Sequence, residues 1–240
     1  MAEPAPGNFR FRVTPGFAAH LFKAVAKQHH KELLPLLRPL VPADAIVFDV
    51  GAHAGQFAKL FARLAPRGTV YAIEPGRYAR FILRAALRLN RIRNVAVLPF
   101  ALGDRPGVSL LTVPVKRSGS YGFGLAHLGA GAREAETELV PVATLDDTVA
   151  SLGLQRLDFI KADIEGYEHR LILGARATLA RFRPALLLEM NEAHLARAGG
   201  SLAALWALLV ELGYQAYAPT PERTPIAAPA PGDVLWLHRG

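Results

Sequence analysis

The first half of the chain alternates between short apolar runs and segments with helical spacing, and this order limits the fold more than any other feature. Apolar runs at Ala45–Val50, Thr69–Ile73 and Val95–Phe100 enclose two segments of helical periodicity, Gln56–Leu64 and Arg77–Leu89. The runs are apolar at nearly every position, which is typical of parallel strands covered on both faces. We therefore expect an α/β sheet with right-handed strand–helix–strand units.

The second half of the chain continues this pattern. It predicts strands at Leu157–Asp163, Ala185–Met190, Tyr214–Ala218 and Val234–His238, and helices at Thr144–Leu152, Tyr167–Phe182 and Ser201–Leu212. Short strands at Val108–Val113 and Glu138–Val142 predict an inserted hairpin. Its connection at residues 116–124 is rich in glycine and serine, and suits either a mobile loop or a substrate-facing lid. The predicted fold class is α/β and Rossmann-like, with a seven-stranded, mostly parallel sheet and helices on both faces.

The length of 240 residues suits one α/β domain preceded by a short extension. Residues 1–44 are predicted to form an N-terminal helical extension. It is expected to be extended or disordered over residues 1–16, and helical over Phe17–Lys31 and Glu32–Leu40. Residues 45–240 are predicted to form the domain that carries the functional site.

The composition excludes several classes of protein. The chain has no cysteine, which excludes disulfides, thiolate metal sites and cysteine nucleophiles. No apolar run reaches the ~18 residues of a membrane span. The proline-containing N-terminus lacks the apolar core of a signal peptide. A cytoplasmic location without membrane association is therefore expected.

The net charge of +8 is compatible with binding to nucleic acid, anionic lipid or an acidic substrate. Five arginines of one predicted helix share a face at helical spacing: Arg77, Arg80, Arg84, Arg88 and Arg91. A solvated helix face explains them better than a phosphate-binding stripe, because no exposed aromatic residues interleave with them. Nucleic acid is therefore not the expected partner.

A loop with two glycines joins the first predicted strand to the first helix of the domain. Gly51 permits a tight turn and a close backbone approach by a ligand, and Gly55 lets the start of the helix pack near the strand. Such loops at the carboxyl ends of strands face the ligand crevice in open α/β sheets. We therefore assign the following loop residues to a cofactor site: Asp49, Gly51, Ala52, His53 and Gly55.

The loop favours S-adenosylmethionine over a dinucleotide. His53 stands where the dinucleotide fingerprint has its middle glycine, and Asp49 would repel a pyrophosphate by a few kcal/mol. S-adenosylmethionine has no phosphate, and Asp49 suits its positive methionine end, directly or through the geometry of the loop. Glu74, at the end of the second strand, can accept both ribose hydroxyls. Each acid also has a purely structural explanation, Asp49 as a helix cap and Glu74 as a solvated strand end.

Three charged residues close the fourth predicted strand of the domain. Alternation by two places Lys161, Asp163 and Glu165 on one face, next to the first strand at the topological switch point. Such charges are unusual on a buried strand, so we expect them beside the reactive methyl group. Asp163, Glu165 or His169 would remove the proton of the acceptor, and Lys161 would stabilise the developing alkoxide. An ion-pair network that only orients the loop is the alternative.

Three further histidines are His29, His30 and His194. His194 follows Glu189, and together with Asp163 they have the donor atoms that a divalent ion prefers. Their spacing is not diagnostic, so no metal ligand is assigned. His29 and His30 are predicted to be surface residues of the N-terminal extension.

These motifs resemble the FkbM-like family of S-adenosylmethionine-dependent methyltransferases. The resemblance covers residues 45–190 in order, and rests on Val47–Gln56, Ala72–Pro75, Ala101–Asp104, Thr144–Asp147, Phe159–Glu168, Leu173–Ala175 and Leu187–Glu189. The Asp-x-Gly loop together with the Lys-x-Asp-x-Glu-Gly segment is its specific part. The chain departs from the family at His53, where asparagine is common, and at His169, where leucine is common.

The resemblance implies a class I methyltransferase domain at residues 45–240, with S-adenosylmethionine as the cofactor. It also implies O-methylation of a hydroxyl on a sugar, a polyketide or another natural product. The cofactor residues that it implies are Asp49, Gly51, Glu74 and, through backbone contacts with the adenine, Ala101 and Leu102. It also implies that Asp163 faces the methyl group, so this residue belongs to both the cofactor and the catalytic set.

Other functions stay open at this stage. A nucleic-acid (RNA) methyltransferase suits the positive charge, although the Asp-Pro-Pro-Tyr type of motif for base methylation is absent after the fourth strand. An NAD-dependent oxidoreductase is disfavoured by the missing glycine. A non-catalytic binding protein could keep the same fold. The expected partner is a small-molecule or glycan acceptor, and a homo-oligomer is compatible with the sequence.

Overall fold

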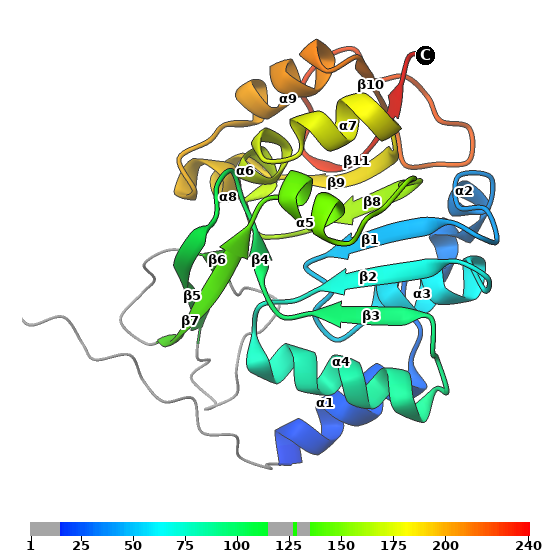
Figure 1. Cartoon of the computed structure of the whole chain (residues 1–240), viewed down its shortest axis with the longest axis vertical. Coiled ribbons are helices and arrows are strands. Elements are labelled where there is room, and N and C mark those ends of the chain that lie inside the picture. The colour runs from blue at the N-terminus through cyan, green and yellow to red at the C-terminus, as the bar shows by residue number, and fades with distance from the viewer. Residues whose placement is uncertain (1–14, 115–126, 129–134) are drawn as a thin grey trace, which may run out of the picture.

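A seven-stranded sheet forms the centre of the fold, and the computed structural model describes residues 15–114, 127–128 and 135–240. The strand order is β10 (Tyr214–Tyr217), β11 (Gly232–His238), β9 (Ala185–Met190), β8 (Phe159–Ala162), β1 (Ile46–Val50), β2 (Thr69–Ile73) and β3 (Val95–Leu98). Only β11 runs antiparallel to its neighbours, β9 and β10. The predicted seven-stranded, mostly parallel sheet is confirmed (Figure 1).

Both faces of this sheet are buried, and successive residues of each strand supply the two cores. Phe48 and Ile160 belong to one core, and their chain neighbours Val47 and Phe159 to the opposite core. The first core is covered by α5 (Leu145–Ser151), α6 (Glu168–Leu173), α7 (Arg176–Phe182) and α9 (Leu202–Glu211). The second face is covered by α2 (Leu34–Leu37), α3 (Gln56–Leu64) and α4 (Arg77–Leu89). Burial on both faces explains why the strands are apolar throughout.

A second, four-stranded sheet stands beside the ends of β1, β2 and β3 (Figure 1). Its order is β4 (Ala101–Leu102), β7 (Ala135–Ala143), β5 (Gly107–Pro114) and β6 (His127–Leu128). The antiparallel pair β5 and β7 confirms the inserted hairpin, whereas the two-residue β4 was too short to predict. The predictions for residues 1–14 and for the glycine- and serine-rich segment 116–124 lie outside the described residues.

The helix predicted over Tyr167–Phe182 is two helices, α6 and α7, because the chain turns at Gly174. A Cβ on Gly174 would lie 2.1 Å from the carbonyl oxygen of Gly103, so this approach of two backbones needs a glycine. The turn also lets Asp146 accept hydrogen bonds from the first backbone N–H groups of α7, at 2.8 and 3.1 Å. These groups would otherwise have no intrahelical partner.

The N-terminal helices are shorter than predicted. Helix α1 (Pro15–Ala26) packs on α4 (Figure 1), and α2 is a single turn that follows a 3₁₀ turn at Lys31–Leu33. Pro39 limits α2, because it has no N–H to continue the hydrogen-bond ladder. One short helix, α8 (Glu192–Arg197), was not predicted; the side chain of Asn191 caps its start. None of the described helices has the length and apolar character needed to cross a membrane.

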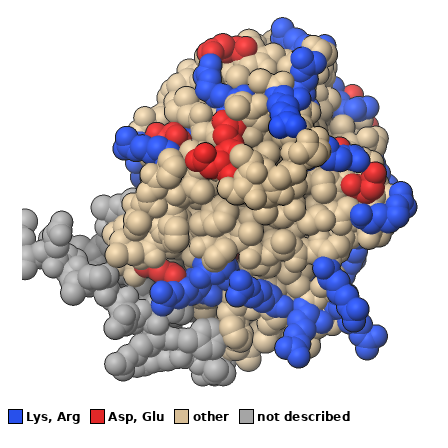
Figure 2. All heavy atoms as spheres, viewed as in Figure 1, with Lys and Arg blue, Asp and Glu red and all other residues tan. Residues whose placement is uncertain are grey.

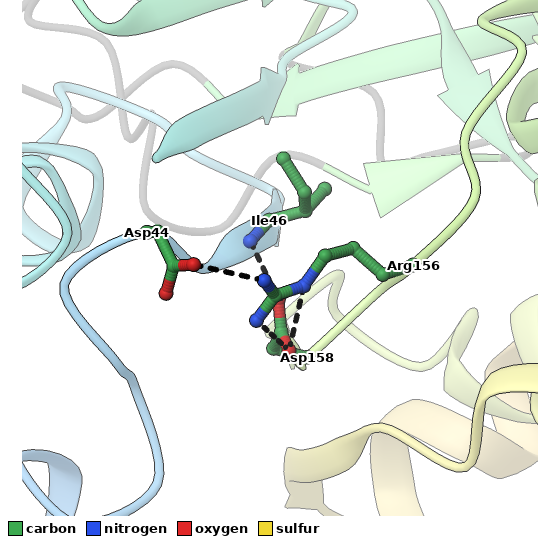
Figure 3. Close-up of polar contacts among 4 residues, drawn as sticks. All are labelled: Asp44, Ile46, Arg156 and Asp158. Atoms are coloured by element: carbon green, nitrogen blue, oxygen red, sulfur yellow. Dashed lines mark hydrogen bonds and ion pairs between the residues drawn. The ribbon is translucent and has the colours of Figure 1, made fainter. Parts of the chain in front are cut away.

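Polar contacts at the amino edge of the sheet join β1 to β8 (Figure 3). Asp158 Oδ2 accepts a hydrogen bond of 2.7 Å from the backbone N–H of Ile46. The same carboxylate pairs with Arg156 at 2.8 Å, and Arg156 also reaches Asp44 at 3.0 Å. Arg156 and Asp44 are about half exposed, so their pairing adds little stability. This edge is therefore closed by structural contacts, and the opposite edge is free to carry a site.

At the carboxyl edge, β1 and β8 come closest at Gly51. Its φ is 76°, and a Cβ there would lie 2.1 Å from the carbonyl oxygen of Asp163. The left-handed backbone disfavours a side chain, and the contact with a backbone atom leaves no room for one. The sequence suggested that a ligand approaches Gly51 closely; the structure shows that the chain's own backbone does so.

Gly51→Ala is expected to lower the free energy of unfolding by about 3 kcal/mol or more, because left-handed strain adds to the clash with Asp163. Gly153→Ala is the matched control, since Gly153 also has a positive φ of 63° but nothing within 4 Å of the added Cβ. This control should cost about 1–2 kcal/mol. Urea denaturation of the three proteins measures both losses, and equal losses would contradict the role of the backbone contact.

Candidate active site

A cavity of about 270 Å³ lies at the carboxyl edge of the main sheet, between the loop after β1 and the second sheet. Its walls include nine residues that the sequence assigned to the site: Gly51, Ala52, His53, Glu74, Ala101, Leu102, Lys161, Asp163 and Glu165. Asp49, Gly55 and His169 do not line it. The fold thus brings together the ends of β1, β2 and β8 with β4, although these segments are far apart in the sequence.

Hydrogen bonds hold the loop after β1 against the end of β2. The backbone N–H groups of Gly51 and Ala52 both donate to the carbonyl of Ile73, at 2.9 and 3.1 Å. The backbone N–H of His53 donates to Glu74 Oε2 at 2.8 Å. His53 has a left-handed backbone (φ 47°), which costs about 1 kcal/mol or more for a residue with a side chain. The loop and the Glu74 carboxylate therefore form one rigid unit.

Glu74 presents its carboxylate to the cavity. Besides the bond from His53, it accepts a second hydrogen bond, from the backbone N–H of Gly76 to Oε1, at 2.8 Å. A carboxylate oxygen has two lone pairs, so each oxygen of Glu74 keeps one for a ligand. Burial raises the pKa of Glu74 to about 7, against the opposing effect of these hydrogen bonds.

Apolar side chains form the wall next to Glu74. Ala101 and Leu102 are buried, and Leu111, Val113 and Leu128 come from the second sheet. Such a wall suits a flat, weakly polar group such as an adenine ring. The sequence predicts the hairpin, but nothing in its pattern indicates that the hairpin lines the site.

Two predicted cofactor residues lie behind the wall of the cavity. Gly55 has a φ of 83°, and its Cβ would lie 2.4 Å from Leu83 Cδ1, so it serves the packing of α3 on α4. Asp49 is fully buried, and neither of its oxygens has a hydrogen-bond partner among the described residues. Its counter-charge is Lys161 Nζ at 4.0 Å. Any effect of Asp49 on a ligand therefore acts through Lys161 and the loop.

Lys161 lies between two carboxylates. The register of β1 and β8 places it beside Asp49, and its Nζ is 3.4 Å from Asp163 Oδ2 and 4.8 Å from the centre of the Phe57 ring. Burial alone would lower the pKa of Lys161, but the attraction of Asp163 and Asp49 outweighs it and raises the pKa. Burial raises the pKa of Asp49 to about 6, and Lys161 opposes the rise.

Strand alternation does not place Glu165, because β8 ends before it and its backbone is left-handed (φ 55°). Its Oε2 lies 3.0 Å from His194 Nδ1, which is also 3.7 Å from Glu189. Burial raises the pKa of both Glu165 and Glu189. Within the described residues, no three His, Asp or Glu side chains are arranged to hold a metal ion.

Two histidines lie where the sequence did not place them. His169, a predicted candidate base, packs against Gly200, where an added Cβ would lie 3.0 Å from its Nδ1. His30, predicted to be a surface residue, lines the cavity and stacks on Phe57 with ring centroids 4.3 Å apart. The contact of His30 with the cavity was not predicted, because it depends on a tertiary contact with α3 that no spacing in the sequence indicates.

The strand order, with β11 inserted antiparallel between β9 and β10, is that of the class I methyltransferase fold. SMU.1697c from Streptococcus mutans, solved in complex with SAH, aligns with a TM-score of 0.50 at 12% identity, over 84% of this chain and 93% of that one. FkbM from Methylobacillus flagellatus aligns with a TM-score of 0.49 at 16% identity, over 93% of this chain and 58% of that one.

The chain belongs to the FkbM methyltransferase domain family, which residues 49–216 match. This confirms the resemblance found in the sequence. The family consists of S-adenosylmethionine-dependent methyltransferases, so the oxidoreductase alternative no longer applies.

Three relatives show how far the similarity extends. AMB antimetabolite synthetase AmbE of Pseudomonas aeruginosa is 27% identical over 207 residues, which is 73% of this chain and 10% of that protein. 2-O-methyltransferase NoeI of Sinorhizobium fredii is 25% identical, over 64% of this chain and 65% of its own length. 31-O-demethyl-FK506 methyltransferase FkbM of Streptomyces tacrolimicus is 32% identical, over 56% and 60%. The chain therefore spans less than two thirds of each relative.

Lys161→Met is expected to lower the free energy of unfolding by about 3 kcal/mol or more, because Asp49 would stay buried without its counter-charge. Adding Asp49→Asn to this variant should recover part of the loss. The loss should also be smaller near pH 5 than near pH 8, since the raised pKa lets Asp49 take up a proton in the folded state. Urea denaturation of the two single variants and the double variant tests this coupling. Additive effects at both pH values would contradict it.

Proposed function

We propose that this chain transfers the methyl group of S-adenosylmethionine to a hydroxyl of a small molecule or sugar. The observation that carries the proposal is the Glu74 carboxylate, which faces the cavity and keeps one lone pair on each oxygen. Two adjacent ribose hydroxyls match these two acceptors. The cavity thus offers the ribose a fixed partner directly beside the loop after β1.

The other walls suit the rest of the cofactor. Ala101 and Leu102, with the apolar residues of the second sheet, would enclose the adenine, and the backbone of Gly51–His53 would pass along the methionine part. When bound, S-adenosylmethionine supplies an activated methyl group on its sulfonium. Asp163, on the β8 side of the cavity, would then lie toward the acceptor, held in place by Lys161.

A neutral hydroxyl compound suits the acceptor side of the cavity. Asp163 and Glu165 place carboxylates there. Glu189 on β9 and Asp233 on β11 lie opposite each other in the register of these two neighbouring strands. Carboxylates accept hydrogen bonds from hydroxyl groups and repel phosphates. The names of two relatives, a 2-O- and a 31-O-demethyl-FK506 methyltransferase, support oxygen as the atom that receives the methyl group.

The distribution of charge argues against RNA as the acceptor. Figure 2 shows Lys and Arg side chains along the lower edge of the molecule, where α4 lies in Figure 1. Helix α4 contributes Arg77, Arg80, Arg84 and Arg88. On the reacting side of the cavity the cation Lys161 is already paired with Asp163, so a nucleotide would meet carboxylates there.

The acceptor class can be tested by screening with S-adenosylmethionine and detecting the mass gain of one methyl group. We expect transfer to hydroxylated small molecules, such as a panel of methyl hexosides and macrolactone alcohols, and none to transfer RNA or ribosomal RNA fragments. The dependence of the transfer rate on salt concentration is a second measurement, because RNA binding weakens steeply as salt rises. Transfer to RNA alone would overturn the proposal.

Glu74→Gln is expected to weaken the binding of S-adenosylhomocysteine by about tenfold or more, which corresponds to about 1.4 kcal/mol. In the wild type, binding should strengthen between about pH 6 and pH 8, because the ionised carboxylate is the better acceptor and the pKa of Glu74 is about 7. The raised pKa means that ionisation costs the free protein stability as the pH rises from about 4.5 to about 7, and the ribose hydrogen bonds offset that cost. Calorimetry over this pH range measures both effects.

Glu168→Gln is the control for the Glu74 variant. Burial also raises the pKa of Glu168 to about 7, and its Oε1 accepts a hydrogen bond from the backbone N–H of Ile164 at 2.8 Å, but it does not line the cavity. This variant should keep both the affinity and the pH dependence of the wild type. If Glu74→Gln also keeps both, the ribose assignment is wrong.

A further inference from the structure

Residues 28–30 follow α1 and contact the start of α3, and His30 reaches the cavity. His30 has a left-handed backbone (φ 62°, ψ 23°), which costs about 1 kcal/mol or more for a residue with a side chain. Its ring lies nearly parallel to that of Phe57, with 16° between the planes, and lines the cavity together with Lys161 and Asp163. The fold therefore holds His30 in this position against its local backbone preference.

Contacts from α3 fix the position of this segment. The side-chain amide of Gln28 donates to the carbonyl of Gln56 at 2.9 Å, and the backbone N–H of His29 donates to Gln56 Oε1 at 3.1 Å. Lys59, which is buried, donates through Nζ to the carbonyl of Lys27 at 2.8 Å and to that of Ala24. His30 is thus tied to the same helix that follows the cofactor loop.

The carboxylates on this side of the cavity already have charged partners. Asp163 pairs with Lys161 at 3.4 Å, and Glu165 pairs with His194 at 3.0 Å. The one ion-pair contact of His30 with a described residue is long, with 3.8 Å between its Nδ1 and Oε1 of Glu32. Among these groups, His30 is the one free to accept a proton.

The surroundings of His30 lower its pKa and so favour the neutral ring near pH 7. Burial lowers its pKa, and Lys161 and His29 add to this effect, whereas Glu32 and Asp233 oppose it. The side chain is 41% exposed, so the ring can exchange a proton with water. A neutral imidazole that contacts both the cavity and solvent has the properties of a general base.

We propose that His30 contacts the methyl acceptor and takes the proton of its hydroxyl, so that its ring forms one wall of the acceptor subsite. The inference rests on the proposed methylation of a hydroxyl. The acceptor oxygen forms the new O–C bond as the S–C bond of the cofactor breaks and its electron pair stays on sulfur. The hydroxyl proton passes to the imidazole and then to solvent, which leaves a methyl ether and regenerates the neutral ring.

An uncharged polyol, such as a sugar ring, is the acceptor class that fits this subsite. One hydroxyl would lie at His30, and its neighbours would donate to the carboxylates of Asp163 and Asp233. Burial and the charge of Asp163 raise the pKa of Asp233, and Asp163 also raises the pKa of Glu189, which is the register partner of Asp233 on the neighbouring strand. A phosphorylated acceptor would meet repulsion there.

The test compares His30→Ala with His29→Ala, a matched control whose side chain is exposed and lies outside the cavity. Methyl transfer to methyl hexosides should fall about a hundredfold or more in His30→Ala and stay within about twofold in His29→Ala. The affinity for S-adenosylhomocysteine should not change in either variant. Added imidazole should restore part of the rate in His30→Ala, and the decline of the wild-type rate at acidic pH should be absent from that variant.

Two further measurements keep the inference testable. His30→Asn retains a residue that tolerates the left-handed backbone, and should lose activity even if His30→Ala does not fold. In the wild type bound to S-adenosylhomocysteine, a methyl hexoside should shift the imidazole NMR signal of His30 and leave that of His29 in place. If the wild type transfers methyl groups and both His30 variants match its rate and pH profile, the inference is wrong. If the wild type methylates no hydroxylated compound, the proposed function falls, and this inference falls with it.

Discussion

A charged lysine inside the sheet is the constraint on which the site depends. Lys161 is 5% exposed, and a buried ammonium group is stable only with opposite charges close to it. The parallel pairing of β1 with β8 provides Asp49 at the neighbouring register position, and the first residue after β8 provides Asp163. Because Asp49 is itself fully buried, Lys161 cannot be removed without leaving a buried carboxylate unpaired. The ionic cluster therefore fixes the distance between the two strands from which the cavity begins.

The same pair of strands sets the shape of the cofactor loop. The backbone N–H of Asp163 donates to the carbonyl of Val50 at 3.2 Å, and its own carbonyl occupies the space where Gly51 would carry a Cβ. The loop must therefore turn with a left-handed glycine, and the turn brings the N–H of His53 to Glu74. The contact of Asp163 with Val50 and Gly51 thus determines both the charged side of the cavity and the orientation of the Glu74 carboxylate on its other side.

The half of the site that we assign to the cofactor follows from the sequence because its residues lie directly at the ends of strands. Gly51, Glu74 and Lys161 each sit where an apolar run stops, and parallel strands gather such positions at one edge. The acceptor half has no such local signal. His30 and His169 are both histidines in segments predicted to be helical, and only the packing of the N-terminal segment on α3 distinguishes them. The break at Gly174 was missed for a similar reason, since it depends on the backbone of a distant glycine, Gly103.

Helix α3 links the two halves of the site. The cofactor loop ends at its first residue, while Phe57 in its first turn supports His30 on one side and Lys161 on the other. Two residues further on, Lys59 is 1% exposed, and its Nζ donates to the carbonyls of Ala24 and Lys27 at the end of α1, where a helix has its negative pole. Burial lowers the pKa of Lys59 to about 8, which keeps most of its charge near neutral pH, and those carbonyls solvate the charge. The N-terminal segment is therefore part of what stabilises α3, and a movement of that segment would displace the cofactor loop and the acceptor wall together.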